Sequence, residues 1–257
     1  ALVCHLVISP DGVLKSWNFT RAVIRVAANL AYEDAQAAID SATGVPPALA
    51  EAGQAERPST ARASAEATDL VEAALKPLWA CWAALGKARD KRAPLELDLP
   101  ERRVVLDEKG HILSVAPRER LDAHRLIEDY MIAANVAAAK ALEAKKAPVM
   151  YRIHEPPSRE KLVALKDYLD TFGISFALGQ VIKPNTFNQL LERVGERDER
   201  PQIMEQVLRT QTQAYYAPAN HGHFGLALGS YAHFTSPIRR YADLVVHRAL
   251  VAAYGLG

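Results

Sequence analysis

The strongest structural signal in the sequence is a long helical segment, RLDAHRLIEDYMIAANVAAAKALEAK, at residues 120–145. Its apolar residues recur with the spacing of a helix. The segment before it, residues 94–117, alternates between apolar and polar residues around a turn at 107–110, which predicts a β-hairpin. Residues 149–155, after the helix, predict a short strand. Helices and strands therefore follow one another without regular βαβ alternation, and this order predicts an α+β fold.

The other elements are predicted from the same patterns. Residues 2–8 and 13–19 flank a turn with Pro10 and Gly12, which predicts a hairpin with a buried first strand. Segment 44–66, rich in Ala, Pro, Gly and Ser, shows no periodicity and predicts a loop or mobile insertion. Further helices are expected at residues 30–41, 67–92 with a kink at Pro77, 158–173, 185–194, 201–210 and 237–254.

Composition sets limits on the function. The chain has 257 residues, of which 49% are apolar, so it can bury a sizeable core. Lys and Arg number 31 against 30 Asp and Glu, and any basic site must therefore be local. Cys4 and Cys81 lie in apolar runs outside any metal-binding spacing, which favours a reducing compartment. No membrane-spanning run and no signal peptide are found, so we expect a cytoplasmic protein.

Near its C-terminus the chain reads HFTSPIRRYADLVVHR, a helix start combined with several cations. Thr235 or Ser236 is a favourable N-cap and Pro237 suits the first helical position, so we expect the helix to begin there. Arg239 and Arg240 would then lie at the positive end of the helix dipole, which costs up to about 1 kcal/mol each unless an anion compensates. The pattern predicts an anion site that phosphate would occupy.

Asp243 is predicted to brace one of these arginines and also His247, because residues four apart share a helix face. The alternative for the whole segment is a surface helix with an ordinary Arg–Asp pair.

Segment 223–234, HFGLALGSYAHF, is predicted as a strand pair or one long strand. One alternating face is aliphatic, whereas the other combines glycine and alanine with His223, Tyr231 and His233. The second face would let a polymer backbone approach closely and would offer rings for base stacking. Close packing against another strand is the alternative. His221 and His223 suggest zinc, but no further ligand stands at motif spacing, so we assign no metal ligand.

Two pairs of polar residues are further candidates. Glu128 and Asn135 share a face of the long helix and could hold metal-bound water or a phosphate and sugar; a solvated helix edge is the alternative. Arg152 and His154 project from one face of the strand at 149–155, either as a polar cleft wall or as a plain exposed face.

With these residues identified, the segment YAHFTSPIRRYADLVVHRAL resembles the signature of the catalytic RNB domain of the ribonuclease II and ribonuclease R family. The similarity continues through LAYEDAQ, LELDLPE, RLIEDYMIAANVAAAKAL, YRIHEPPSREKL and HFGLAL, with 44–66 as a variable insertion. The resemblance implies that residues 1–257 are the C-terminal portion of a single RNB-type domain. It also implies a mixed sheet packed with several long helices around an RNA channel.

Members of this family degrade single-stranded RNA processively from the 3′ end, using magnesium and water to release nucleoside monophosphates. By resemblance, Arg239 would hold the scissile phosphate, Glu128 would lie near the 3′ end, and Tyr32 would contact RNA. Relatives often carry a stacking phenylalanine where LELDLPE stands here, and Leu97 is its nearest equivalent. The remaining expected RNA contacts are Asn135, Arg152, His154, Tyr231, His233, Ser236 and Arg240.

The sequence departs from the family in its metal site. The family's Mg²⁺ ligands are a cluster of aspartates that includes an adjacent pair, and here Asp11, Asp34 and Asp98 are isolated. We therefore expect the Mg²⁺ ligands, and the flanking OB-type barrels, to lie outside this chain. The expected partners are single-stranded RNA and the N-terminal part of the same domain, with no membrane. The alternatives are a non-catalytic RNA-binding or scaffold module and an α+β domain unrelated to nucleic acid.

Overall fold

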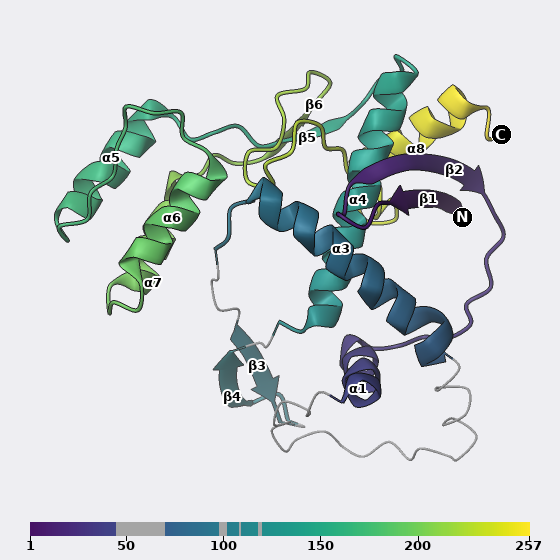
Figure 1. Ribbon diagram of the computed structural model, residues 1–257, viewed down its shortest axis with the longest axis horizontal. Coiled ribbons are helices and arrows are strands. Elements are labelled where there is room, and N and C mark those ends of the chain that lie inside the picture. The colour runs from purple at the N-terminus through teal and green to yellow at the C-terminus, as the bar shows by residue number, and fades with distance from the viewer. Residues whose placement is uncertain (45–69, 98–101, 108, 118–119) are drawn as a thin grey trace. The chain divides into compact units, whose positions relative to one another are not determined.

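A computed structural model describes residues 1–44, 70–97, 102–107, 109–117 and 120–257 (Figure 1). Helices alternate irregularly with small antiparallel ladders, which confirms the predicted α+β class. The strands of the described ranges form three separate two-stranded ladders rather than one mixed sheet. The chain divides into two compact units, of which the first comprises residues 1–88 and 119–133 and the second residues 89–118 and 134–257. The predicted insertion at 44–66 lies, except for Gly44, outside the described residues.

The first unit begins with the predicted hairpin, β1 (Leu2–Ile8) and β2 (Leu14–Arg21), which pair antiparallel. The side chains of β1 are half-buried or exposed, so the expected buried first strand is not found, and Phe19 of β2 provides the buried ring. The turn between the strands depends on Gly12, whose φ is +79°. A Cβ at this position would lie 1.9 Å from the carbonyl oxygen of Ala84, so the turn packs directly on the helix that carries Ala84.

The helices of this unit pack through a small apolar cluster. Helix α1 (Tyr32–Thr43) ends at Gly44, and its Ile39 packs with two residues of the π-helical turn η1 (Val71–Leu75). Helix α3 (Lys76–Arg92) follows η1 without a break. The π turn lies directly before Pro77, where the proline ring would clash with the preceding turn of a regular helix. A kink was predicted at Pro77, and the structure has a π-helical turn directly before this residue.

Helix α4 (Asp122–Ala144) is the long helix predicted from residues 120–145. Its first part belongs to the first unit and its second part to the second unit. In the second part, Ala137, Ala138, Ala139 and Ala141 are fully buried, which lets neighbouring segments approach the helix closely. The hairpin β3 (Arg102–Leu106) and β4 (Ile112–Pro117) is also as predicted, and it belongs to the second unit.

Three helices of the second unit, α5 (Arg159–Asp170), α6 (Pro184–Val194) and α7 (Arg200–Thr210), lie side by side in Figure 1. They enclose an apolar core that includes Leu165, Phe187 and Ile203, each fully buried. Ser158 caps α5, and Gly173, with φ +68°, follows its last turn as predicted.

The strand pair or single long strand predicted at 223–234 is reduced to an isolated antiparallel bridge. Only His223 and Leu228 form bridges there, and their backbone groups exchange two hydrogen bonds, from His223 N to Leu228 O at 2.7 Å and back at 3.1 Å. Gly222 and Ala227 have positive φ, so the chain turns where a strand would continue. The strand pair of this region is instead β5 (Tyr151–Ile153) with β6 (Tyr215–Ala217).

Among the described residues, no helix is long and apolar enough to cross a membrane.

Candidate nucleic-acid interface

The last helix, α8 (Tyr241–Tyr254), begins later than predicted. Arg240 is its N-cap, and the residues before it form a turn in which Ser236 O accepts hydrogen bonds from Arg239 N and Arg240 N, at 3.3 and 3.1 Å. Ser236 therefore does not cap the helix with its side chain. Its backbone N–H donates instead to Asp243 Oδ1 at 2.7 Å, which ties the turn to the helix.

Asp243 is the buried anchor of this turn. Its side chain is fully buried and receives Arg240 Nε on Oδ2 and Arg240 Nη2 on Oδ1, both at 2.8 Å. Burial by itself raises the pKa of Asp243, but the hydrogen bonds from Arg240 and Ser236 outweigh it and hold that pKa below its ordinary value. The carboxylate is therefore charged at neutral pH, and its two oxygens face a two-pronged guanidinium.

The two arginines consequently have different roles. Arg240 is half-buried and bound to Asp243, so its guanidinium compensates a protein charge. Arg239 is exposed, and its guanidinium makes no hydrogen bond or ion pair with any residue in the described ranges. The expectation that both arginines share an anion site in the first helical turn was wrong, because Asp243 already neutralises one of them. Arg239 is the arginine that this turn presents to solvent.

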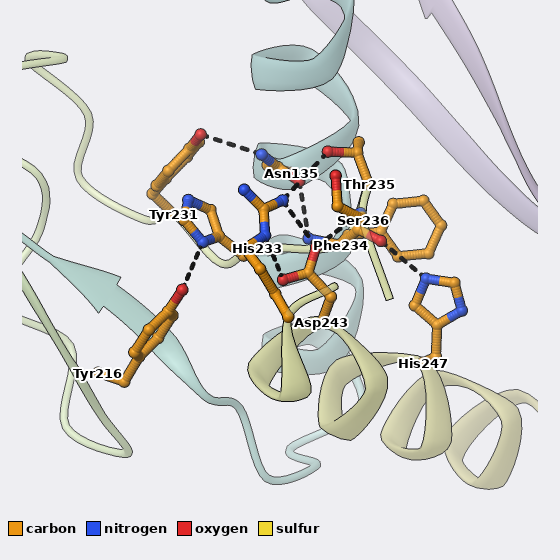
Figure 2. Close-up of polar contacts among 10 residues, drawn as sticks. Asn135, Tyr216, Tyr231, His233, Phe234, Thr235, Ser236, Asp243 and His247 are labelled. Carbon is orange, nitrogen blue, oxygen red and sulfur yellow. Dashed lines mark hydrogen bonds and ion pairs between the residues drawn. The ribbon is translucent and has the colours of Figure 1, made fainter. Parts of the chain in front are cut away.

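His247 is not braced by Asp243, contrary to the prediction. Its Nε2 donates to the carbonyl oxygen of Phe234 at 2.7 Å, and its ring stacks on the Phe234 ring with centroids 4.5 Å apart. The three hydrogen bonds that Asp243 accepts come from Ser236 N and from Arg240 Nε and Nη2. His247 therefore fixes the segment that leads into the turn (Figure 2).

Asn135 on α4 holds the same segment from the other side. Its side chain is buried, its Nδ2 donates to Tyr231 Oη at 3.0 Å, and its Oδ1 accepts from Phe234 N at 2.8 Å (Figure 2). Both ends of the amide are thus bonded within the protein. Asn135 positions the segment before Arg239, and this is a different task from the direct RNA contact that the sequence suggested.

A row of aromatic and imidazole rings runs through this unit. Neighbouring rings meet edge to face, with centroids 5.2 Å apart for His154 and His223, 5.2 Å for His223 and Tyr231, and 5.6 Å for Tyr231 and His233. Tyr216 continues the row, 5.6 Å from His233, and its hydroxyl lies 2.7 Å from His233 Nδ1. We call these five residues the ring row. Such edge-to-face contacts favour a fixed arrangement of the rings.

Arg152 is the cation that lies next to the ring row. Its guanidinium lies over the Tyr216 ring, 4.8 Å from the centroid, and Nη1 donates to the carbonyl oxygen of Ala214 at 3.1 Å. The predicted alternation of this strand is confirmed in part: Tyr151 and Ile153 are buried and Arg152 is half-buried, but His154 is buried as well. Tyr216 was missed in the sequence, although two adjacent tyrosines at 215 and 216 were a visible signal for a ring-bearing strand.

The histidines of the ring row are held neutral. Burial, followed by the nearby His154 and Arg152, lowers the pKa of His223 to about 4. Burial, followed by the charge of Arg240, lowers the pKa of His233 to about 4 as well. Burial also lowers the pKa of His154. At neutral pH these rings are therefore uncharged hydrogen-bonding groups, and the positive charge of the region resides on the arginines.

The unfolding free energy is expected to fall as the pH is lowered from about 6.5 towards about 4. In this window the unfolded histidines, with ordinary pKa values of 6.5, bind protons that the folded His223 and His233 do not bind. The contribution of these two histidines to the unfolding free energy is thus fully present above pH 6.5 and is lost below about pH 4. Urea unfolding at about pH 7 and about pH 5 measures the difference, and a His233→Asn variant should reduce it. Equal stability at the two pH values would contradict these protonation states.

The remaining predicted residues lie elsewhere. Leu97 is half-buried and packs against the core of α5, α6 and α7. Glu128 is exposed and pairs with Arg120, within the first unit. Tyr32, in the same unit, stacks on His124 with ring centroids 4.3 Å apart. Of the predicted set, the structure thus brings together Asn135, Arg152, His154, Tyr231, His233, Ser236, Arg239 and Arg240 in the second unit.

Comparison with known proteins identifies the family. The family model described as the RNB domain matches residues 1–255. Ribonuclease R of Vibrio cholerae is 35% identical over 249 residues, which are 97% of this chain and 28% of that protein. The chain thus spans less than a third of that relative's length.

Solved structures show the same fold. Mycoplasma genitalium RNase R in complex with ribose-methylated single-stranded RNA has a TM-score of 0.78 at 25% identity, over 97% of this chain and 36% of that one. Yeast Ssd1, described as a pseudonuclease, has a TM-score of 0.65 at 20% identity, over 98% of this chain and 28% of that one. Since the family model covers nearly every residue, the chain belongs to the RNB domain family.

Proposed function

We propose that this chain is part of a 3′-to-5′ exoribonuclease that hydrolyses single-stranded RNA processively to nucleoside monophosphates. The observation that carries the proposal is the contrast between the two arginines: Arg240 is bound inward to buried Asp243, and Arg239 is left exposed on the turn that this pair holds. A guanidinium that stands on a held backbone turn, and that has no anionic partner among the described residues, is suited to a phosphate whose charge grows in the transition state.

The comparisons support this proposal. The curated relatives are named ribonuclease R, and one solved structure of that name holds single-stranded RNA. In our proposal Arg239 donates to the non-bridging oxygens of the scissile phosphate. Glu128 lies near the 3′ end of the RNA, and Tyr32 is an aromatic contact to the RNA. Tyr216, Tyr231 and His233 form the wall along which the RNA passes. The proposed location of the protein is the cytoplasm.

Magnesium is proposed as the cofactor, with its ligands outside this chain. Mg²⁺ takes oxygen ligands that include one or two carboxylates. Within the described residues, no three His, Cys, Asp or Glu side chains gather in an arrangement that could hold a metal ion. We therefore propose that the N-terminal part of the same domain supplies the carboxylates and is the chain's structural partner. When bound, the ion would activate water and stabilise phosphate charge.

The test uses the full-length parent protein and a single-stranded oligoribonucleotide labelled at its 5′ end. The proposal expects magnesium-dependent shortening from the 3′ end, release of nucleoside monophosphates, and resistance of an oligonucleotide whose 3′ end is blocked. Internal cleavage, or products other than monophosphates, would contradict it.

A second candidate function is an RNA-binding module without hydrolysis. It is favoured by the absence of a metal-binding group among the described residues, and a pseudonuclease shares the fold. The same experiment distinguishes the two functions, because this module would bind the oligonucleotide and leave its length unchanged. Binding should weaken with salt in either case, because phosphate contacts release counterions.

A further inference from the structure

A groove beside the ring row has no role in the function proposed above. It has a volume of about 550 Å³ and lies entirely within the second unit. Its walls include His154, Pro156, Pro184, His221, His223 and Leu228. The groove is open to solvent, and its volume falls in the range of small-molecule sites, which are mostly apolar with a few polar groups.

The groove is built on a rigid loop, residues 222–229. Besides the bridge between His223 and Leu228, Phe224 N donates to His154 O at 2.7 Å and Leu95 N donates to Gly225 O at 2.8 Å. Gly225 lets the loop lie against His154, since a Cβ there would be 2.8 Å from His154 Nδ1. The concave shape is thus fixed by backbone hydrogen bonds to several elements, and it exists before any ligand binds.

The walls of the groove carry no acidic or permanently cationic side chain. None of the residues that line it is Asp, Glu, Lys or Arg. His154 Nδ1 accepts a hydrogen bond from Gly225 N at 2.9 Å and His223 Nδ1 accepts one from Leu226 N at 3.2 Å. Both neutral rings therefore carry their proton on Nε2. The His154 ring uses its N–H in a hydrogen bond with the Thr212 backbone, so His223 is the ring that can donate to a ligand. A phosphate would find no compensating charge there, whereas a neutral ligand with acceptor atoms would be accommodated.

These properties fit a nucleobase. A base has flat apolar faces that proline, phenylalanine and imidazole rings can cover, and its edge carries carbonyl and ring-nitrogen acceptors. The ring row connects the groove with the segment before Arg239, because His154 and His223 belong to both. We propose that the groove binds one unstacked base of the single-stranded RNA whose phosphate Arg239 contacts. This inference rests on the proposed function and adds a base-binding subsite to it.

The test measures binding of single-stranded oligoribonucleotides to the full-length parent protein without magnesium, so that hydrolysis does not interfere. A series of oligonucleotides carries a single abasic nucleotide at each position in turn. The parent is expected to bind one member of the series about tenfold more weakly, because one stacked base is lost. Fluorescence anisotropy gives the dissociation constants.

Two variants assign that position to the groove. Ala227→Leu adds carbons to a residue that lines it, and His221→Ala removes an exposed ring that makes no hydrogen bond within the described chain. Both variants should bind the intact oligonucleotide more weakly than the parent does. In both, the abasic nucleotide at the sensitive position should weaken binding by less than about twofold, because the variant has already lost the interaction that the abasic nucleotide removes. His111→Ala removes an exposed histidine that does not line the groove and should keep the parent's profile.

The outcomes separate the two proposals. If the parent bound the intact oligonucleotide and every abasic oligonucleotide with the same dissociation constant, the base subsite would be overturned and the exoribonuclease proposal would stand. Unchanged profiles in both groove variants would do the same. If the parent bound no oligoribonucleotide at all, the proposed function would fail and the subsite with it.

Discussion

Replacing Arg239 with alanine in the full-length parent protein is expected to lower turnover of single-stranded RNA by about three orders of magnitude. RNA binding should weaken by less than about tenfold, because one of many phosphate contacts is lost. The asymmetry follows from the role proposed for Arg239. Its guanidinium carries no protein ion pair in the described chain, and its interaction is strongest when the phosphate gains charge.

Two further variants test whether geometry or charge matters at this position. Arg239→Lys keeps the charge but loses the two-pronged donor arrangement, so turnover should recover only in part. Arg248→Ala removes an exposed arginine of helix α8, which follows the turn that carries Arg239, and should leave turnover near that of the parent. Single-turnover kinetics with saturating protein separates chemistry from binding. Equal turnover of parent and Arg239→Ala would remove Arg239 from catalysis.

Replacing Asp243 with asparagine is expected to have the largest effect on stability, about 3 kcal/mol in the unfolding free energy. Asparagine keeps the shape of the side chain but leaves the half-buried Arg240 guanidinium without a counter-charge. It also replaces an acceptor of the Ser236 N–H by a neutral oxygen or an amide group. Because Asp243 is fully buried, water does not replace its hydrogen bonds, and water hydrates the half-buried Arg240 only in part.

Urea unfolding followed by circular dichroism measures this effect. Asp170→Asn is the matched control, since Asp170 pairs with Lys166 at the surface and its loss should cost no more than about 0.5 kcal/mol. A double variant, Asp243→Leu with Arg240→Met, should regain part of the lost stability, because neither charge is then buried alone. If Asp243→Asn and Asp170→Asn were equally stable, the buried pair would not be the anchor of the turn.

Patterns over long segments predicted the elements well. The long helix α4, the hairpins β1–β2 and β3–β4, and helices α5, α6 and α7 lie where periodicity and turn residues indicated them. Such signals are local, because each residue's preference is set by neighbours within one helical turn or one strand pair. The α+β class follows from the order of these elements, and the family follows from the extended match of the motifs.

The errors concern segments whose conformation depends on distant partners. Segment 223–234 alternates like a strand, but backbone bonds to His154 and Leu95 and the positive φ of Gly222 make it a turn. Thr235, Ser236 and Pro237 resemble a helix start, yet the helix begins at Tyr241 because Asp243 binds the Ser236 N–H. In the first case the local preference is overridden by hydrogen bonds to distant segments, and in the second by a hydrogen bond across seven residues.

The amino-acid sequence by itself determined the elements, the family and the presence of a guanidinium-rich turn ahead of the last helix. Only the tertiary structure decided which arginine is available, because a fully buried carboxylate must be compensated and Arg240 compensates it. It likewise decided that His154, His223 and His233 are neutral, since burial and nearby arginines disfavour their protonated forms. The spacing placed Asp243 within reach of an arginine, but burial, which depends on residues from distant parts of the chain, is not encoded by the spacing within one segment.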